Sequence, residues 1–145
     1  MKALVERLHR TGCSCVVAHG DDVRMFWARG VADLYGLLRD EPGFLRESRV
    51  ADKVVGKGAA ALMVAGGVTA VYADTMSRRA LDLLERHGVR TDCAQVVSGI
   101  RNREGTGWCP VEERCAPLTD IAGMVDTIGR FLREKQSFPG AEEQQ

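Results

Sequence analysis

The spacing of apolar residues divides the chain into helical and extended segments. In the helical segments apolar residues recur three or four positions apart, as Leu4, Val5 and Leu8 do, with charged residues on the opposite face. This spacing predicts helices at residues 2–11, 31–38, 48–67, 78–87 and 119–134. Short runs of β-branched and other apolar residues predict strands at residues 13–18, 23–28, 68–73 and 93–97.

The segment from Ser48 to Gly67 is apolar almost all round, which predicts one buried central helix capped by Ser48. Three charges, on Asp52, Lys53 and Lys57, interrupt its first half. Charges on an otherwise buried helix either reach solvent at one end or belong to a site. The head of this predicted helix is therefore the first candidate site.

The order of the elements predicts an α/β fold. The first two strands flank a short polar turn and form a predicted hairpin, and strands that alternate with helices follow it. Right-handed crossovers then give a mixed sheet of four to five strands with helices on both faces, a three-layer α/β/α sandwich. The length of 145 residues fits one domain over residues 1–135, and the polar segment 136–145 is predicted to be a disordered tail.

Composition narrows the classes of partner. The 20 basic and 20 acidic side chains give no net charge, so no overall field favours nucleic acid or an acidic membrane. No apolar run reaches the roughly 20 residues that a membrane span needs, and the first residues lack the apolar segment of a signal peptide. We therefore expect a cytoplasmic protein. The five cysteines fit reduced thiols better than a disulfide framework.

Lys53 and Lys57 lie one turn apart on the predicted central helix and would share a face. Together with the positive potential of a helix N-terminus, they could hold a phosphate or a carboxylate. The alternative is two lysines that reach solvent from a buried helix. Asp52 is expected to pair with one of these lysines or with Arg101 or Arg103.

The stretch from residue 98 to residue 107 is the second candidate site. It follows the end of a strand, where open α/β sheets bind ligands, and its glycines let backbone amides turn toward an anion. The alternative is a flexible connection. Trp108 beside it could stack on a base or simply anchor the loop. The predicted ligand contacts in this stretch are Arg101, Asn102, Arg103, Gly105 and Gly107.

Cys109 precedes a predicted helix start, because Pro110 suits the first helical position and acidic side chains suit the first turn. The helix N-terminus would stabilise a Cys109 thiolate, whereas Glu112 and Glu113 oppose it by charge repulsion. A reactive thiol with a carboxylate as acid or base is one interpretation; a buried cysteine with a capping glutamate is the other. Asp52, Cys109 and Glu112 are therefore candidate catalytic residues, and Glu113 is a predicted ligand contact.

The order of elements and the segment Val50–Lys53 resemble the cytidine deaminase fold. In that fold one helix opens with His-Ala-Glu or Cys-Ala-Glu and a later helix with Pro-Cys-x-x-Cys; these motifs hold zinc, and the glutamate moves protons. Val50 stands at the first zinc-ligand position, Asp52 at that of the glutamate, and residues 73–78 contain no cysteine. The resemblance implies the fold without its metal, so zinc-dependent deaminase activity is not expected.

Two longer motifs, Asp52–Leu62 and Asn102–Glu113, resemble the DUF1893 family, a family of unknown function classed with the deaminase-like folds. The resemblance covers most of the chain, and Val111 stands where methionine is more usual. Since deaminase-like folds commonly form dimers or larger assemblies, the resemblance implies a homo-oligomer. It adds little about activity.

Three functions follow from these observations. The first is zinc-independent and cofactor-free binding of a nucleotide or a similar anionic or phosphorylated small molecule, at the head of the central helix. The second is an enzyme of unknown reaction that uses Asp52, Cys109 or Glu112. The third is a non-catalytic structural or regulatory oligomer. Neither nucleic acid nor a membrane is an expected partner.

Overall fold

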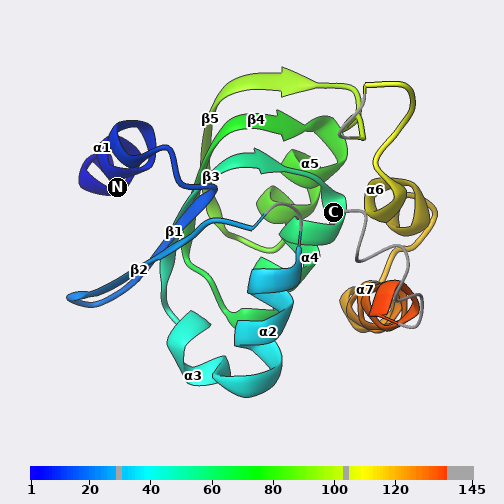
Figure 1. Cartoon of the computed structure of the whole chain (residues 1–145), viewed down its shortest axis with the longest axis horizontal. Coiled ribbons are helices and arrows are strands. Elements are labelled where there is room, and N and C mark those ends of the chain that lie inside the picture. Colours follow the sequence, from blue (N-terminus) through cyan, green and yellow to red (C-terminus); the bar gives the residue numbers. More distant parts are fainter. Residues whose placement is uncertain (29–30, 103–104, 137–145) are drawn as a thin grey trace.

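The computed structural model describes residues 1–28, 31–102 and 105–136 and is an α/β structure (Figure 1). Its elements follow in the order α1 (Lys2–Thr11), β1 (Cys15–His19), β2 (Asp22–Phe26), α2 (Ala32–Asp40), α3 (Pro42–Leu45), β3 (Arg49–Val55), α4 (Lys57–Gly66), β4 (Ala70–Ser77), α5 (Arg78–Arg86), β5 (Arg90–Val97), α6 (Pro110–Cys115) and α7 (Ile121–Gln136).

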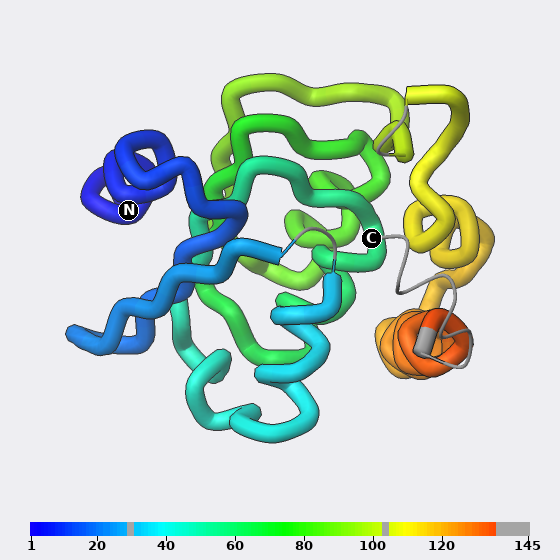
Figure 2. The backbone as a smooth tube through the Cα atoms, in the orientation of Figure 1, coloured from blue at the N-terminus to red at the C-terminus, as the bar shows by residue number. Residues whose placement is uncertain are grey.

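The strands form one five-stranded mixed sheet in the order β2-β1-β3-β4-β5. β1 pairs antiparallel with β2 and with β3, whereas β3, β4 and β5 run parallel to one another. Parallel neighbours need crossover connections, and α4 and α5 supply them. The predicted three-layer α/β/α sandwich is confirmed, with α1 on one side of the sheet and α4 and α5 on the other (Figure 2).

The prediction of a single central helix over 48–67 is wrong. Residues Arg49–Val55 form β3, which pairs on both edges and so lies in the middle of the sheet, and only Lys57–Gly66 form a helix, α4. A strand buried on both faces is a continuous apolar run, and apolar periodicity alone does not separate such a run from a buried helix. The supposed helix head at Val50–Lys53 is therefore the middle of a strand.

Most other predicted elements are confirmed within a few residues. Gly12 ends α1 with a positive φ of 76°, and the Ser77 hydroxyl caps α5 by accepting a hydrogen bond from Ala80 N–H at 3.1 Å. α3 was not predicted, because its Pro-Gly pair is typical of a break in the chain. The predicted disordered tail, residues 136–145, lies outside the described residues except for residue 136.

The largest apolar cluster surrounds α4. The sheet covers one side of this helix, while α2, α5, α6 and α7 pack around it. A side chain at Gly58 would overlap Val111, so α6 sits directly against the first turn of α4. On the other face of the sheet, α1 packs through Leu4 and Leu8 onto β1 and β3. The fold thus brings the start of α4, the end of β5 and α6 to one edge of the sheet.

Two general features complete the fold. The five cysteines are free thiols, of which Cys13, Cys15 and Cys115 are buried. Within the described ranges, no helix combines the length and the apolar character that crossing a membrane requires.

Candidate functional site

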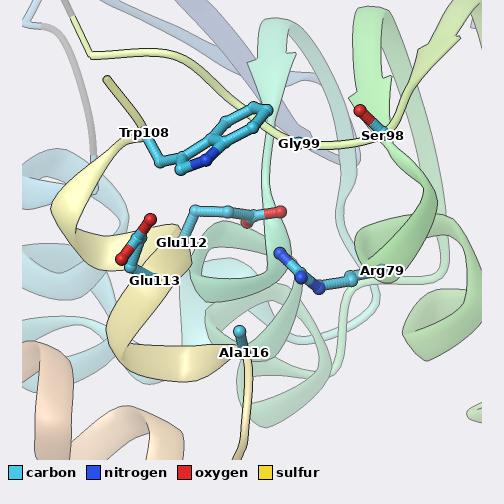
Figure 3. Close-up of a pocket in the computed structure, with 7 residues that line it drawn as sticks. All are labelled: Arg79, Ser98, Gly99, Trp108, Glu112, Glu113 and Ala116. Atoms are coloured by element: carbon cyan, nitrogen blue, oxygen red, sulfur yellow. The ribbon is translucent and has the colours of Figure 1, made fainter.

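A pocket of about 350 Å³ lies at the carboxyl end of the parallel strands (Figure 3). This volume is within the range of small-molecule sites, and the carboxyl ends of parallel strands are where open α/β sheets bind ligands. The pocket is lined from the first turn of α5, the residues after β5 and the segment around α6: Arg79, Ser98, Gly99, Trp108, Glu112, Glu113 and Ala116.

The segment before α6 folds back on itself and delivers Trp108 to the pocket. Arg101 and Trp108 form an isolated antiparallel bridge, and Cys109 N–H donates to Ile100 O at 2.7 Å. The Arg101 guanidinium lies 4.5 Å from the centre of the Trp108 ring. A Cβ at Gly99 would come within 3.0 Å of that ring, so Gly99 permits the close approach. Trp108 is therefore held in place while 44% of it stays exposed.

Glu112 is the buried acid of the pocket, with only 2% of the residue exposed. Its Oε2 accepts a hydrogen bond from the backbone N–H of Lys57, the first residue of α4. A carboxylate at a helix N-terminus is favourable, because the first N–H groups lack helical partners and carry partial positive charge. The other oxygen, Oε1, is buried and has no hydrogen-bond partner among the described residues.

Lys57 ties the α6 segment to α4. Its Nζ donates to the carbonyl oxygens of Ala116, at 2.9 Å, and Leu118, at 2.7 Å. The residue is only 8% exposed, and burial lowers the pKa of its amine. The amine is thus engaged by the protein itself. Together with the backbone N–H that binds Glu112, it makes Lys57 a support of the pocket wall.

Lys53 lies elsewhere, and the prediction that it shares a helix face with Lys57 is wrong. Lys53 belongs to β3, and its Nζ donates to Gly12 O, at the end of α1, at 2.9 Å. The strand ends and α4 begins between the two lysines. The structure therefore does not bring Lys53 and Lys57 together around one anion.

Asp52 lies in the middle of β3, opposite Cys15 of β1. It is partly buried, and burial raises the pKa of Asp52 to about 7, while a hydrogen bond from Val54 N–H acts in the opposite direction. Burial and then the nearby Asp52 raise the pKa of Cys15 well above its usual value. In the described part of the chain Asp52 forms no ion pair, so its predicted pairing with a lysine or with Arg101 is wrong.

The three candidate catalytic residues do not form one constellation. Glu112 lines the pocket, Asp52 does not, and Cys109 occupies the N-cap position of α6 without lining the pocket. The positional match of Val50 and Asp52 to a helix-borne deaminase motif is also wrong, because both residues lie on a strand.

The predicted ligand contacts of the loop have mixed outcomes. Glu113 lines the pocket, and Arg101 stacks on Trp108. Asn102 closes the loop internally, since its Oδ1 accepts from Thr106 N–H at 3.1 Å. Gly105 adopts a positive φ of 72°. Gly107 also belongs to this turn, where its carbonyl accepts from Asn102 N–H, and Arg103 lies outside the described residues.

Arg79 and Ala116 line the pocket without having been predicted from the sequence, and Arg79 is the charged one of the two. It follows the Ser77 cap in the first turn of α5, and its guanidinium points across the pocket toward the Glu112 carboxylate (Figure 3). No carboxylate in the described ranges forms an ion pair with it. In the sequence it looks like any solvent-facing arginine on an amphipathic helix, so no local signal marked it.

The charges of the lining are arranged asymmetrically. Two carboxylates, on Glu112 and Glu113, stand on the α6 side, and one guanidinium, on Arg79, stands on the α5 side. Among the described residues, those of the pocket included, no three His, Cys, Asp or Glu side chains gather in a way that could hold a metal ion. The pocket can therefore contact a ligand through hydrogen bonds, an aromatic face and one cationic group.

Sheet order, layers and pocket define an α/β/α sandwich protein with a ligand-sized pocket at the carboxyl edge of its parallel strands. The chain belongs to the DUF1893 family, since the family TM1506, described as a domain of unknown function (DUF1893), matches residues 3–132. This confirms the resemblance found in the sequence motifs.

A solved structure supports the fold. A crystal structure of a DUF1893 family protein from Thermotoga maritima matches with a TM-score of 0.80 and 19% sequence identity, covering 88% of this chain and 86% of that chain. At this identity the likeness shows the fold alone. A search of curated proteins finds no match. The more specific prediction of a cytidine deaminase-like fold is not tested by these comparisons.

Proposed function

We propose that this protein binds a small molecule that joins a planar nitrogen heterocycle to an anionic group, a nucleotide in the simplest case, in the pocket beside Glu112. The observation that carries the proposal is the buried, unpartnered Oε1 of Glu112, a residue that lines a ligand-sized pocket. Buried polar atoms in proteins are nearly always hydrogen-bonded, so an exception on a pocket-lining residue indicates a donor supplied from outside the protein.

The free-energy cost of leaving Oε1 without a hydrogen bond favours a ligand that supplies one. An unsatisfied buried acceptor costs about 1–3 kcal/mol, and more when it is charged. A ligand N–H that reaches Oε1 recovers this cost, whereas an apolar ligand leaves it in place. The Glu112 carboxylate therefore favours a polar nitrogen-bearing group at this point of the pocket.

Trp108 and Arg79 supply the other two contacts. The exposed part of Trp108 offers a flat apolar surface, which suits the face of an aromatic heterocycle. The Arg79 guanidinium presents a fork of donors suited to a phosphate or a carboxylate. A ligand with a planar ring and one anionic end uses both contacts at once.

The proposed site differs from the site predicted from the sequence, which was the head of the central helix. The start of α4, once expected to bind an anion through two lysines, instead gives its first N–H to Glu112. Lys57 contributes by positioning α6, and direct ligand contact is assigned to the pocket-lining side chains.

The other two functions inferred from the sequence have weaker support. Glu112 alone of the candidate catalytic residues reaches the pocket, so no nucleophile and acid pair supports an enzyme. A homo-oligomer stays a prediction, which light scattering of the purified protein tests separately.

Fluorescence tests the proposed function, because the chain has two tryptophans and only Trp108 lines the pocket. A Trp27→Phe variant leaves Trp108 as the single reporter. We expect nucleoside monophosphates to change its emission in a saturable manner. Arg79→Ala should weaken the affinity about tenfold, the loss of a charge-assisted contact.

Arg78→Ala is the matched control, because Arg78 is an exposed neighbour that does not line the pocket. Its affinity should equal that of the unmodified pocket. Nucleotides that change neither the Trp108 emission nor the melting temperature would refute the proposed function.

A further inference from the structure

We infer that Glu112 makes the pocket selective for ligands whose ring presents N–H donors, and that it rejects rings that present only acceptors. This inference rests on the proposed function and specifies the base that the site accepts. It is carried by two facts about Glu112, a side chain that lines the pocket: one carboxylate oxygen accepts from the Lys57 N–H, and the other is buried without a hydrogen-bond partner among the described residues.

The orientation of the carboxylate is set by the start of α4. Oε2 accepts from the Lys57 backbone N–H, and a helix backbone cannot turn this donor elsewhere. A Cβ at Gly56 would lie 2.5 Å from Oε2, so the bare backbone at Gly56 also shapes the space that this oxygen occupies. The Lys57 N–H thus restrains the carboxylate through Oε2, and Oε1 is the oxygen left without a partner.

A carboxylate accepts hydrogen bonds and donates none when it is ionised. A ring N–H or an exocyclic amino group therefore satisfies Oε1, whereas a ring nitrogen lone pair or a carbonyl oxygen placed there is repelled. Sites that present a buried polar group to the ligand reject analogues that leave this group unpaired more strongly than sites that only match shape.

The surrounding charges give the ligand one orientation. Glu113 stands next to Glu112 on the α6 side, and Arg79 stands on the α5 side (Figure 3). A nucleotide fits with its amino edge toward α6 and its phosphate toward α5. The reverse orientation would place phosphate against two carboxylates.

A series of purine nucleotides tests the inference on the unmodified protein. Guanosine and adenosine 5′-monophosphates carry exocyclic amino groups, whereas purine riboside 5′-monophosphate keeps the same ring, sugar and phosphate without any N–H on the ring. We expect the better of the two amino nucleotides to bind at least about tenfold more tightly than purine riboside 5′-monophosphate.

Glu112→Gln then tests whether Glu112 is the selecting group. The Lys57 N–H must be met by an acceptor, so the glutamine oxygen takes the place of Oε2 and the NH₂ group takes that of Oε1. The free position changes from an acceptor to a donor. The preference for amino nucleotides should disappear or reverse in favour of purine riboside 5′-monophosphate.

Glu85→Gln is the control for a loss of one negative charge, because Glu85 is exposed on α5 and does not line the pocket. It should keep the original preference. Melting curves of both variants check that the fold is retained, and the ligand series on the unmodified protein needs no variant.

The outcomes separate this inference from the proposed function. Equal binding of all three nucleotides refutes the selection by Glu112 and leaves nucleotide binding standing. A preference that survives Glu112→Gln refutes it as well, since another group would then contact the donor. If no nucleotide binds, the inference and the proposed function fail together.

Discussion

Glu112 and Asp52 are two carboxylates set into the interior of the same protein, and their surroundings differ. Glu112 contacts the start of α4 and lines the pocket; one of its oxygens accepts from Lys57 N–H, and the other is buried without a partner among the described residues. Asp52 stands in the middle of a strand beside Cys15, and burial raises its pKa to about 7. Asp52 does not line the pocket.

The comparison shows that a carboxylate with buried atoms need not line a pocket. Asp52 has a perturbed pKa, which is often a mark of a functional group. Glu112 instead combines a fixed orientation, a free acceptor and a space for a ligand. The predictions below test whether the Glu112 region is organised as described and whether Asp52 has a purely internal role.

Lys57→Met should give the largest loss of stability. It removes the donor to the Ala116 and Leu118 carbonyls and releases α6 from α4. We expect a decrease of about 2–4 kcal/mol in the free energy of unfolding, measured by urea denaturation.

Lys53→Met is the control for this change. Lys53 is exposed and makes one hydrogen bond to Gly12, so its loss should cost less than about 1 kcal/mol. Equal effects of the two variants would contradict the supporting role of Lys57.

Asp52→Asn should change how stability depends on pH. The pKa of Asp52 is about 7 in the folded protein against 3.8 for a free aspartate, so the folded state holds this proton more tightly. Its contribution to stability is complete at low pH and is lost as the pH rises from about 4 to about 7. Asp52→Asn should remove this dependence and raise stability at pH 8 by about 1–3 kcal/mol.

Unfolding free energies of both proteins from pH 4 to pH 8 provide the measurement. The curves should diverge up to about pH 7 and then run parallel. A constant difference over the whole range would show that folding does not change the pKa of Asp52. Nucleotide affinity should stay the same in Asp52→Asn, because this side chain lies outside the pocket.

Gly56→Ala should displace the Glu112 carboxylate. The added Cβ would come within 2.5 Å of Glu112 Oε2 and 3.2 Å of Ile100, so the carboxylate must move. We expect a loss of about 1–2 kcal/mol in stability, measured by thermal unfolding, together with weaker nucleotide binding. Gly43→Ala, where a Cβ meets no atom within 4 Å, should leave both quantities unchanged.

Ser77→Ala should have the smallest effect. It removes the side-chain cap of α5 two residues before Arg79 and should cost about 1 kcal/mol, measured by chemical denaturation. Nucleotide affinity should fall less than in Arg79→Ala, because the guanidinium remains present. A larger loss of affinity than in Arg79→Ala would show that the α5 cap, and not the arginine, governs binding.

Much of the fold follows from local sequence signals. α1 has its apolar stripe and terminal glycine, α5 has its serine cap, and the hairpin of β1 and β2 has a polar turn between two short apolar runs. Each of these signals acts within one element. Each prediction held because no distant contact was needed to decide it.

The prediction of one helix over residues 48–67 was wrong because distant contacts decide the structure there. Val50, Val54 and Val55 favour a strand, but the alanines that follow extend the apolar run and hide the change of structure at Gly56. Only pairing with β1 and β4 makes residues 49–55 a strand. That information lies in residues far away along the chain.

The residues that line the pocket were predicted in part for similar reasons. Trp108, Glu112 and Glu113 were recognised because a tryptophan and a helix start with two acids stand beside a glycine-containing loop. Arg79 was not, since it comes from another element and meets the others only through the crossover after β4. The amine of Lys57 was expected to bind an anion, but it binds two carbonyls that no local pattern places there.

Two backbone amides report directly on the two carboxylates, because Lys57 N–H donates to Glu112 and Val54 N–H donates to Asp52. NMR titration of ¹⁵N-labelled protein with guanosine 5′-monophosphate compares them in one experiment. The proposed site predicts a saturable shift of the Lys57 amide and of the Trp108 indole, while the Val54 amide stays in place. A shift of Val54 with Lys57 unmoved, or no shift of either amide, would contradict it.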